Sequence, residues 1–439
     1  MKSMRLVPLA LAVGLAFAAP ARAESLLQLY EAARAQDANW QSARSQYEAN
    51  LARAAQAVAG ILPQAGLAAN VTRSHFELDV PPADRYYTTQ SATVSASQPL
   101  YRPANWATFK QGDKQAQQAE YQLTVAGQDL VIRVSQAYFD VLAAQDTLAF
   151  VRAQKAAVAE QLASAKRNFE VGTATITDTR EAQARYDLVL AQEIAAENDL
   201  RVKKLALDTI VGKNNVEPDP VAVTKVPSPQ PADPEAWVQQ AEAASPQILL
   251  QRAAVDIATL EVDKARAGHK PTVDLVASQN VTRNVGGSTT SGIDNRPKLG
   301  SIGLNFNLPL FAGFATQNRI RETLALEQKA RDDLEATRRT VAQQVRTAYF
   351  GVVSGEGQVR ALEAAEASSQ SALDANRLGY QVGVRINIDV LNAQSQLFQT
   401  KRDLAQARYN VVLGHLKLRQ ANGTLTPDDL TRLSQLLKP

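Results

Sequence analysis

The chain carries one structural unit twice, and this repeat constrains the fold more than any other feature. The first copy contains, in order, Pro99-Leu100-Tyr101, Ala137-Tyr138-Phe139, Val171-Gly172-Thr173 and Asp178. About 210 residues later the same order returns as Pro309-Leu310-Phe311, Ala348-Tyr349-Phe350, Val382-Gly383-Val384 and Asp389. Repeated units bury their apolar faces against one another, so the pattern indicates a function that belongs to an assembly.

Residues 1–23 are predicted to be a signal peptide that is cleaved before Glu24. Lys2 and Arg5 precede an apolar run, and Ala21-Arg22-Ala23 supplies the small residues of a cleavage site. This leader holds three of the 47 basic residues and none of the 44 acidic ones, so the charge of the exported part is balanced. A balanced charge argues against nucleic acid as a partner. The chain has no cysteine, and therefore neither a disulfide framework nor a lipid-acceptor thiol.

Long helices with apolar residues at three- and four-residue spacing are expected over most of the chain. They cover residues 24–60, 103–170 and 179–211 in the first copy and 233–268, 316–380 and 390–420 in the second. The return helices would pack on the long ones as antiparallel coiled coils. At 1.5 Å per residue, some 65 residues make a rod roughly 100 Å long. A single globular core cannot enclose such a rod.

Two β-like segments separate the helices of each copy. Alternation of apolar and small polar residues is regular at 92–97 and 301–308, and weaker in their expected partners at 67–73 and 273–282. The polar stretches that join each pair, 74–85 and the glycine-rich 283–296, are expected to be exposed loops.

No run of 18 apolar residues follows the leader, so the sequence predicts no membrane-spanning helix. If the chain crosses a membrane, strands must do so. Four strands would leave two open edges, which lipid does not tolerate. Several chains would therefore share one barrel, and three chains would supply twelve strands and twelve helical strands around a central duct.

The two helix-turn motifs carry a resemblance to a known family. They read Leu378-Gly379-Tyr380-Gln381-Val382-Gly383-Val384-Arg385-Ile386-Asn387-Ile388-Asp389-Val390-Leu391 and Asn168-Phe169-Glu170-Val171-Gly172-Thr173-Ala174-Thr175-Ile176-Thr177-Asp178. With them the chain resembles the TolC family of outer-membrane export ducts, from Ser25 to Leu425. The resemblance implies a homotrimer with a twelve-strand barrel in outer-membrane lipid. An α-helical tunnel would lie below it in the periplasm, closed at its far end at rest.

The same resemblance implies partners. They are a periplasmic adaptor protein and an inner-membrane pump of the ABC or RND type, and no cofactor is expected. It also implies that five residues of the turns face the adaptor: Val171, Gly172, Thr173, Val382 and Gly383.

A gate latch is expected at the turns. Arg385 and Asp178 lie at equivalent ends of the two hairpins, where a bidentate arginine-carboxylate pair would hold neighbouring helix ends together. The resemblance extends the latch to Tyr380 and Thr177. On spacing alone, these are solvated helix-end charges worth under about 1 kcal/mol; the motif match favours the latch.

Asp389 is expected at the constriction of the duct. Around a threefold axis, one inward carboxylate per chain makes a ring that attracts cations. The family's second acidic position is Asn392 in this chain, which predicts weaker block by cations. The alternative for Asp389 is an acid that the helix dipole favours at a helix N-terminus.

Strand-to-helix transitions are expected at the two Pro-Leu-aromatic motifs, because proline cannot donate a ladder hydrogen bond. Pro99, Tyr101, Pro309 and Phe311 would lie at the base of the barrel near the membrane interface. Residues 24–225 and 226–424 form the two repeats, and residues 425–439 form a tail with a short helix at the equatorial belt.

No enzyme is predicted. His75, His269 and His415 are far apart and lack metal-ligand spacing, and no nucleophile elbow, P-loop or dinucleotide fingerprint occurs. The remaining alternative is an exported periplasmic coiled-coil adaptor or scaffold without a channel. The four amphipathic segments argue for the duct.

Overall fold

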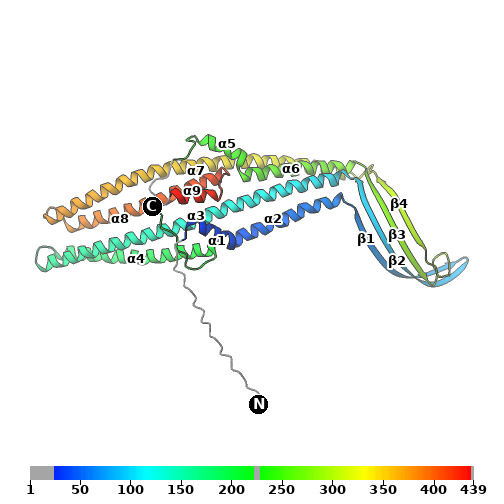
Figure 1. The fold of residues 1–439 in the computed structure, drawn as a ribbon, viewed down its shortest axis with the longest axis horizontal. Coiled ribbons are helices and arrows are strands. Elements are labelled where there is room, and N and C mark those ends of the chain that lie inside the picture. Colours follow the sequence, from blue (N-terminus) through cyan, green and yellow to red (C-terminus); the bar gives the residue numbers. More distant parts are fainter. Residues whose placement is uncertain (1–23, 222–227, 437–439) are drawn as a thin grey trace, which may run out of the picture.

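A computed structural model describes residues 24–221 and 228–436. The predicted signal peptide at 1–23 and the predicted repeat boundary at 225/226 lie outside the described residues. The described chain is an elongated rod, with a sheet at one end and two helical hairpin turns at the other (Figure 1).

The helices follow the expected order. The first half contains α1 (Leu26–Gln36), α2 (Ala38–Gln56), the 3-10 turn η1 (Ala57–Gly60), α3 (Pro103–Glu170) and α4 (Ile176–Val211). The second half contains α5 (Pro234–Ala244), α6 (Pro246–Arg266), the 3-10 turn η2 (Ala267–His269), α7 (Ala315–Gln381), α8 (Asn387–Ala421) and α9 (Asp428–Leu436). The prediction of two very long helices, each with a return helix, is confirmed.

Each expected first helix is broken in two, which the prediction missed. Asp37 ends α1 in an extended conformation and caps α2, because its Oδ1 accepts a hydrogen bond from the backbone N–H of Trp40 at 2.7 Å. Pro246 occupies the first turn of α6 directly after Ser245, where a proline is tolerated. Both breaks lie at mid-length of the rod, where α1 and α5 bend away from the long helices (Figure 1).

Four antiparallel strands form one sheet in chain order: β1 (Gln64–Asp79), β2 (Pro82–Tyr101), β3 (Thr272–Val285) and β4 (Lys298–Asn307). The prediction of an exposed loop at 74–85 was wrong, because β1 and β2 stay paired up to Asp79 and Pro82. His75 lies opposite Tyr86, and their rings stack with centroids 4.3 Å apart. The backbone hydrogen bonds between the strands and this ring stack stabilise the paired strands, although the polar composition of the segment favours a loop. The loop predicted at 283–296 begins only after Val285.

The two faces of the sheet differ in polarity. Cross-strand partners share a face, and one face carries exposed apolar side chains: Leu67, Val71, Val94, Ile302, Leu304 and Phe306. The other face carries hydroxyl and amide groups that bond to one another across strands. Asn280 Nδ2 donates to Thr93 Oγ1 at 2.6 Å, and the hydroxyls of Ser278 and Ser301 lie 2.9 Å apart.

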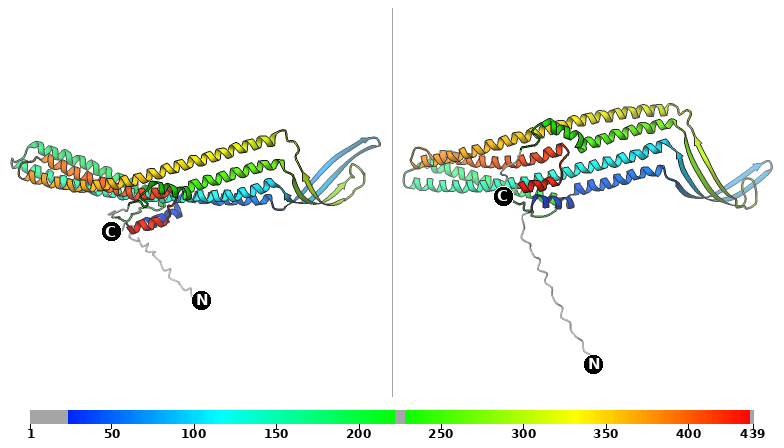
Figure 2. Two further views of the ribbon diagram at one scale, coloured as in Figure 1. Left: turned by 90° about the horizontal axis from the view of Figure 1, so that it is seen from above. Right: turned by 45° about the horizontal axis from the view of Figure 1, so that its top comes forward.

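The main core lies at mid-rod, where α1, α4, α8 and α9 pack on α3. Figure 2 shows the dark-blue α1 and the red α9 together on one side of the long helices. The ring of Phe139 stacks on Tyr409 with centroids 5.7 Å apart. The repeat recurs here: Tyr138 donates to the backbone carbonyl of Asp219 at 2.8 Å, and Tyr349 donates to that of Ala232 at 2.7 Å.

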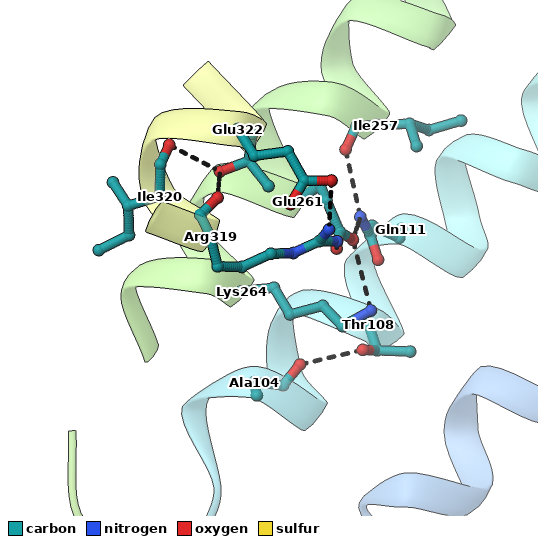
Figure 3. Close-up of polar contacts among 10 residues, drawn as sticks. Ala104, Thr108, Gln111, Ile257, Glu261, Lys264, Arg319, Ile320 and Glu322 are labelled. Atoms are coloured by element: carbon teal, nitrogen blue, oxygen red, sulfur yellow. Dashed lines mark hydrogen bonds and ion pairs between the residues drawn. The ribbon is translucent and has the colours of Figure 1, made fainter. Parts of the chain in front are cut away.

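A polar clamp joins three helices near the sheet (Figure 3). Glu261 of α6 accepts from Gln111 Nε2 of α3 at 3.0 Å and from Arg319 Nη2 of α7 at 2.7 Å. Burial alone would raise the pKa of the Glu261 carboxyl, but these bonds and the nearby Lys264 ammonium together lower it. The clamp holds the helices in register where they meet the strands.

Candidate functional site at the helix tips

The two hairpin turns share one backbone geometry. Gly172 and Gly383 have φ of +78° and +81°, and in each turn the glycine N–H donates to the carbonyl three residues earlier, at 3.0 and 3.1 Å. Glycine adopts this left-handed conformation without the strain that a side chain would add. Val171 and Val382 lie beside the glycines, 73% and 64% exposed. The turns therefore present an apolar residue each at the very end of the rod.

The helices that leave the two turns are capped differently. In the first turn, Thr175 and Asp178 form a reciprocal capping box: Asp178 N–H donates to Thr175 Oγ1 at 3.2 Å, and Thr175 N–H donates to Asp178 Oδ2 at 3.0 Å. In the second turn Ile386 occupies the cap position without a side-chain bond. Its neighbour Arg385 instead approaches Asp389, with Nη1 3.7 Å from Oδ2.

The residues predicted to form a latch lie close to the turns, but within one protomer Arg385 does not contact Asp178. Thr175 bonds only Oδ2 of Asp178, and no cation lies within ion-pair distance of Asp178 among the described residues. Thr177 is exposed. Tyr380 accepts a hydrogen bond from Asn168 Nδ2 at 3.4 Å, which links the second hairpin to the first.

Two asparagines and a glutamine join the hairpins within the protomer, and the sequence reasoning missed them. Asn387 is fully buried; its Nδ2 donates to the Asp178 carbonyl at 3.3 Å, and its Oδ1 accepts from Gln161. Asn168 bonds Tyr380 as described. Both asparagines lie inside the two turn motifs, and for Asn387 the available signal was a polar residue at a helix start between two isoleucines.

The two residues predicted to line a constriction, Asp389 and Asn392, lie on the first turns of α8. Asp389 is the acidic residue of the first turn, where the helix dipole favours it, and Arg385 is its cationic neighbour. Asn392 is exposed, and its Oδ1 accepts a hydrogen bond from Arg185 Nη2 of α4 at 2.8 Å. A cation therefore accompanies each of the two positions.

The expected base of the sheet is where strands meet helices. Pro99 and Tyr101 close β2, with a bulge between them opposite Asp274 and Val273. Phe311 follows β4 and packs edge-on against Phe314 with centroids 5.4 Å apart. Beside them, Arg102 donates from Nε and Nη2 to both oxygens of Asp274, at 2.7 and 2.6 Å. This bidentate pair, which the sequence reasoning missed, ties the start of α3 to β3.

Residues 24–221 and 228–436 offer neither a metal-binding cluster nor a membrane-spanning helix. Within them no group of three or more histidine, cysteine, aspartate or glutamate side chains is arranged to hold a metal ion. Within the same residues no helix is both long and apolar enough to span a bilayer.

Comparison with known proteins decides the family. The family model described as "Outer membrane efflux protein" matches residues 29–213 and 237–424. The chain belongs to the outer membrane efflux protein family. The family consists of channels rather than enzymes, and the chain is accordingly an outer-membrane efflux or secretion channel with a periplasmic portion.

Relatives in this family cover almost the whole chain. The chain is 34% identical to the outer membrane protein TolC of Vibrio cholerae, over 95% of this chain and 94% of that protein. It is 32% identical to the alkaline protease secretion protein AprF of Pseudomonas aeruginosa, over 92% and 85%. The resemblance to the TolC family is thereby confirmed.

Solved structures of outer-membrane proteins share the fold. VceC of Vibrio cholerae superimposes with a TM-score of 0.79 at 20% identity, over 91% of this chain and 96% of that one. The open state of the MtrE channel of Neisseria gonorrhoeae superimposes with a TM-score of 0.75 at 18% identity, over 92% and 90%.

Proposed function

We propose that three copies of the chain close into one export duct. The observation that carries this proposal is the sheet, which has an apolar face, a hydroxyl and amide face, and open edges at β1 and β4. Joining β4 of one copy to β1 of the next pairs every edge and turns the apolar face to lipid. The polar face then lines the lumen. The long helices continue the wall into the periplasm.

The duct would be gated at the helix tips by a latch between protomers. The Arg385 side chain is 59% exposed, and its contact with Asp389 at 3.7 Å is longer than a hydrogen bond. Thr175 occupies only Oδ2 of Asp178, which leaves Oδ1 to accept from a neighbouring chain. Tyr380 and Thr177 lie beside this pair. A ring of three such latches would hold the tips closed.

The partners would be a periplasmic adaptor at the tips and an inner-membrane ABC or RND-type pump. Val171 and Val382, with Gly172, Thr173 and Gly383, form the exposed ends of the rod that an adaptor would cover. The Dickeya chrysanthemi relative is called a proteases secretion protein. Transport energy would come from the pump, and the chain itself would have no catalytic activity.

Planar-bilayer conductance tests the duct and its gate together. The purified protein is compared with an Asp178→Ala, Arg385→Ser double variant, and a Thr175→Ala variant serves as the control. Thr175→Ala removes the capping hydroxyl and keeps the charge of Asp178. We expect a small cation-selective conductance that rises several-fold in the double variant only. If the parent, the double variant and the Thr175→Ala variant all insert as trimers and conduct equally, the latch proposal is wrong.

Fractionation tests the competing scaffold. A trimer in the outer-membrane fraction is the expected result, and family membership favours it. A soluble periplasmic monomer would support the coiled-coil adaptor or scaffold instead.

A further inference from the structure

Four cations gather on the apolar face of the sheet, toward the end farthest from the helices, and one of them, Arg73, already lies over the Tyr86 ring at 5.9 Å from its centroid. Val281 lies opposite Lys298, and Asn284 forms a bridge with Asn295. The same register places Arg296 opposite Arg283, on the face that carries Val281 and Lys298. We call Arg283, Arg296 and Lys298 the basic rim.

The basic rim has no internal counterion. All three side chains are exposed, and none has a carboxylate within 4 Å among the described residues. Like charges directly opposite each other on a sheet face are destabilising, and here two arginines face each other. The nearest acids on this face along β1 and β2 are Glu77 and Asp84, which lie opposite each other beyond Arg73. Asp84 is held by His75 at 2.6 Å.

The position of the basic rim coincides with the edge of an apolar band. Below Lys298 on β4, the same face carries Ile302, Leu304 and Phe306. The distance along the strand from Phe306 to the level of Arg296 is about 34 Å. At a strand tilt near 40°, this distance corresponds to a height of about 26 Å along the barrel axis. That height matches the apolar band of an outer-membrane barrel, about 25 Å. The rim therefore lies where the outer leaflet's acyl chains end and its headgroups begin.

We propose that the basic rim binds the phosphate groups of a phosphorylated glycolipid in the outer leaflet of the outer membrane. Arginine forks bind phosphate oxygens in a bidentate way, and Lys298 adds a point charge one step nearer the acyl chains. The bound phosphate neutralises the facing arginines. The inference rests on the proposed function, because lipid reaches this face only in the barrel.

The neighbouring luminal face argues that the rim serves the lipid side. At the same end of the sheet, Arg85 lies on the luminal face and is already engaged. Its Nη2 donates to the Thr289 carbonyl at 2.8 Å, and its guanidinium lies 4.8 Å from the centroid of the Phe76 ring. Within the described chain, the three cations of the basic rim therefore lack an internal partner on the lipid side, whereas Arg85 on the luminal face has one.

The test measures binding of fluorescent diphosphorylated lipid A to the purified trimer in mixed micelles. Dephosphorylated lipid A and inorganic phosphate are the comparison ligands. The variant carries Arg283→Gln, Arg296→Gln and Lys298→Gln. The control carries the same loss of charge on exposed periplasmic cations, Arg53→Gln, Arg201→Gln and Arg360→Gln. We expect each rim substitution to weaken binding about fivefold and the triple variant about 100-fold. The control should bind as the parent does.

Several results would overturn the inference. Equal affinity for the phosphorylated and dephosphorylated lipids would show that the rim does not recognise phosphate. Full competition by inorganic phosphate at millimolar concentration would show that the rim binds free phosphate and does not require the lipid. A triple variant that binds like its control would place the lipid elsewhere. Trimer assembly and conductance are recorded on the same samples. If trimers form and conduct while rim binding fails, the inference falls alone; if no trimer forms, the proposed duct falls with it.

Discussion

Arg385 lies in the second turn, four residues before Asp389 of α8, with Nη1 3.7 Å from Oδ2. Asp178, the carboxylate proposed as its partner across the protomer boundary, keeps Oδ1 free on the first hairpin. In the proposed trimer, one guanidinium would thus serve two carboxylates. When Arg385 pairs with Asp178, it would hold the tips together. When Arg385 is released from Asp178, it would offset the charge of Asp389 at the constriction.

Arg385→Ser should open the resting channel and expose the charge of Asp389. We expect a several-fold higher conductance and stronger selectivity for cations over anions, because the ring of carboxylates loses its countercharge. Conductance and reversal potential in a salt gradient measure the two effects. Arg385→Lys keeps the charge without the bidentate fork, so it should raise conductance while selectivity stays near that of the parent. Unchanged values in the serine variant would contradict both roles.

Asn392→Asp should strengthen block by a trivalent cation, since it adds a second acidic ring. Arg185 Nη2 donates to Asn392 Oδ1 at 2.8 Å, so the new carboxylate would be partly neutralised. We therefore expect a modest gain from Asn392→Asp alone and about tenfold tighter block when Arg185→Gln is added. Titration of the channel current with the cation measures it. Block that is the same in parent and double variant would place Asn392 away from the constriction.

Asp37→Ala should destabilise the periplasmic helices by about 2 kcal/mol. Asp37 caps α2 and receives two bonds from Arg133, both at 2.9 Å. Urea unfolding followed by circular dichroism measures the loss. Asp233→Ala removes an exposed cap from α5 without an arginine partner and should cost only about 1 kcal/mol. Equal losses in the two variants would show that the Arg133 pair contributes nothing.

Asp37 also predicts a pH dependence. The bonds from Arg133 hold the pKa of the Asp37 carboxyl below its ordinary value, although burial opposes them. Its stabilisation is therefore complete above the unfolded-state pKa, near 3.9, and is lost as pH falls through the lower folded-state value. The stability difference between the parent and Asp37→Ala should shrink as pH falls below about 4. A difference that stays constant from pH 7 to pH 3 would contradict the ion pair.

Gly383→Ala should destabilise the second turn by about 1 kcal/mol. An added Cβ would meet no atom within 4 Å, so the cost comes from φ of +81° rather than from a clash. Gly351→Ala in α7 also meets no atom within 4 Å, and there alanine favours the helix. Opposite shifts in Tm are expected for the two substitutions. A loss of stability in both would mean that contacts between protomers, not backbone strain, set the effect.

The repeat, the long helices and the turns were readable from the sequence because each depends on local pattern. Apolar spacing predicted the long helices α3 and α7 at about their observed bounds, and the glycines of Val171-Gly172-Thr173 and Val382-Gly383-Val384 predicted the reversals. The break at Asp37 and the extent of β1 and β2 were missed. A capping aspartate and a ring stack between His75 and Tyr86 act through geometry that composition does not encode.

By itself the sequence determined that two copies of a rod-and-strand unit follow one another, since helical and strand periodicities are properties of neighbouring residues. Only the tertiary structure decided which charges meet. Asn387 is buried against Asp178 and Arg385 approaches Asp389 because of helix rotation, and the strand register between Val281–Lys298 and Asn284–Asn295 sets Arg283 opposite Arg296. These pairings depend on angles and offsets between distant segments, and a shift of one residue would send each side chain to another face.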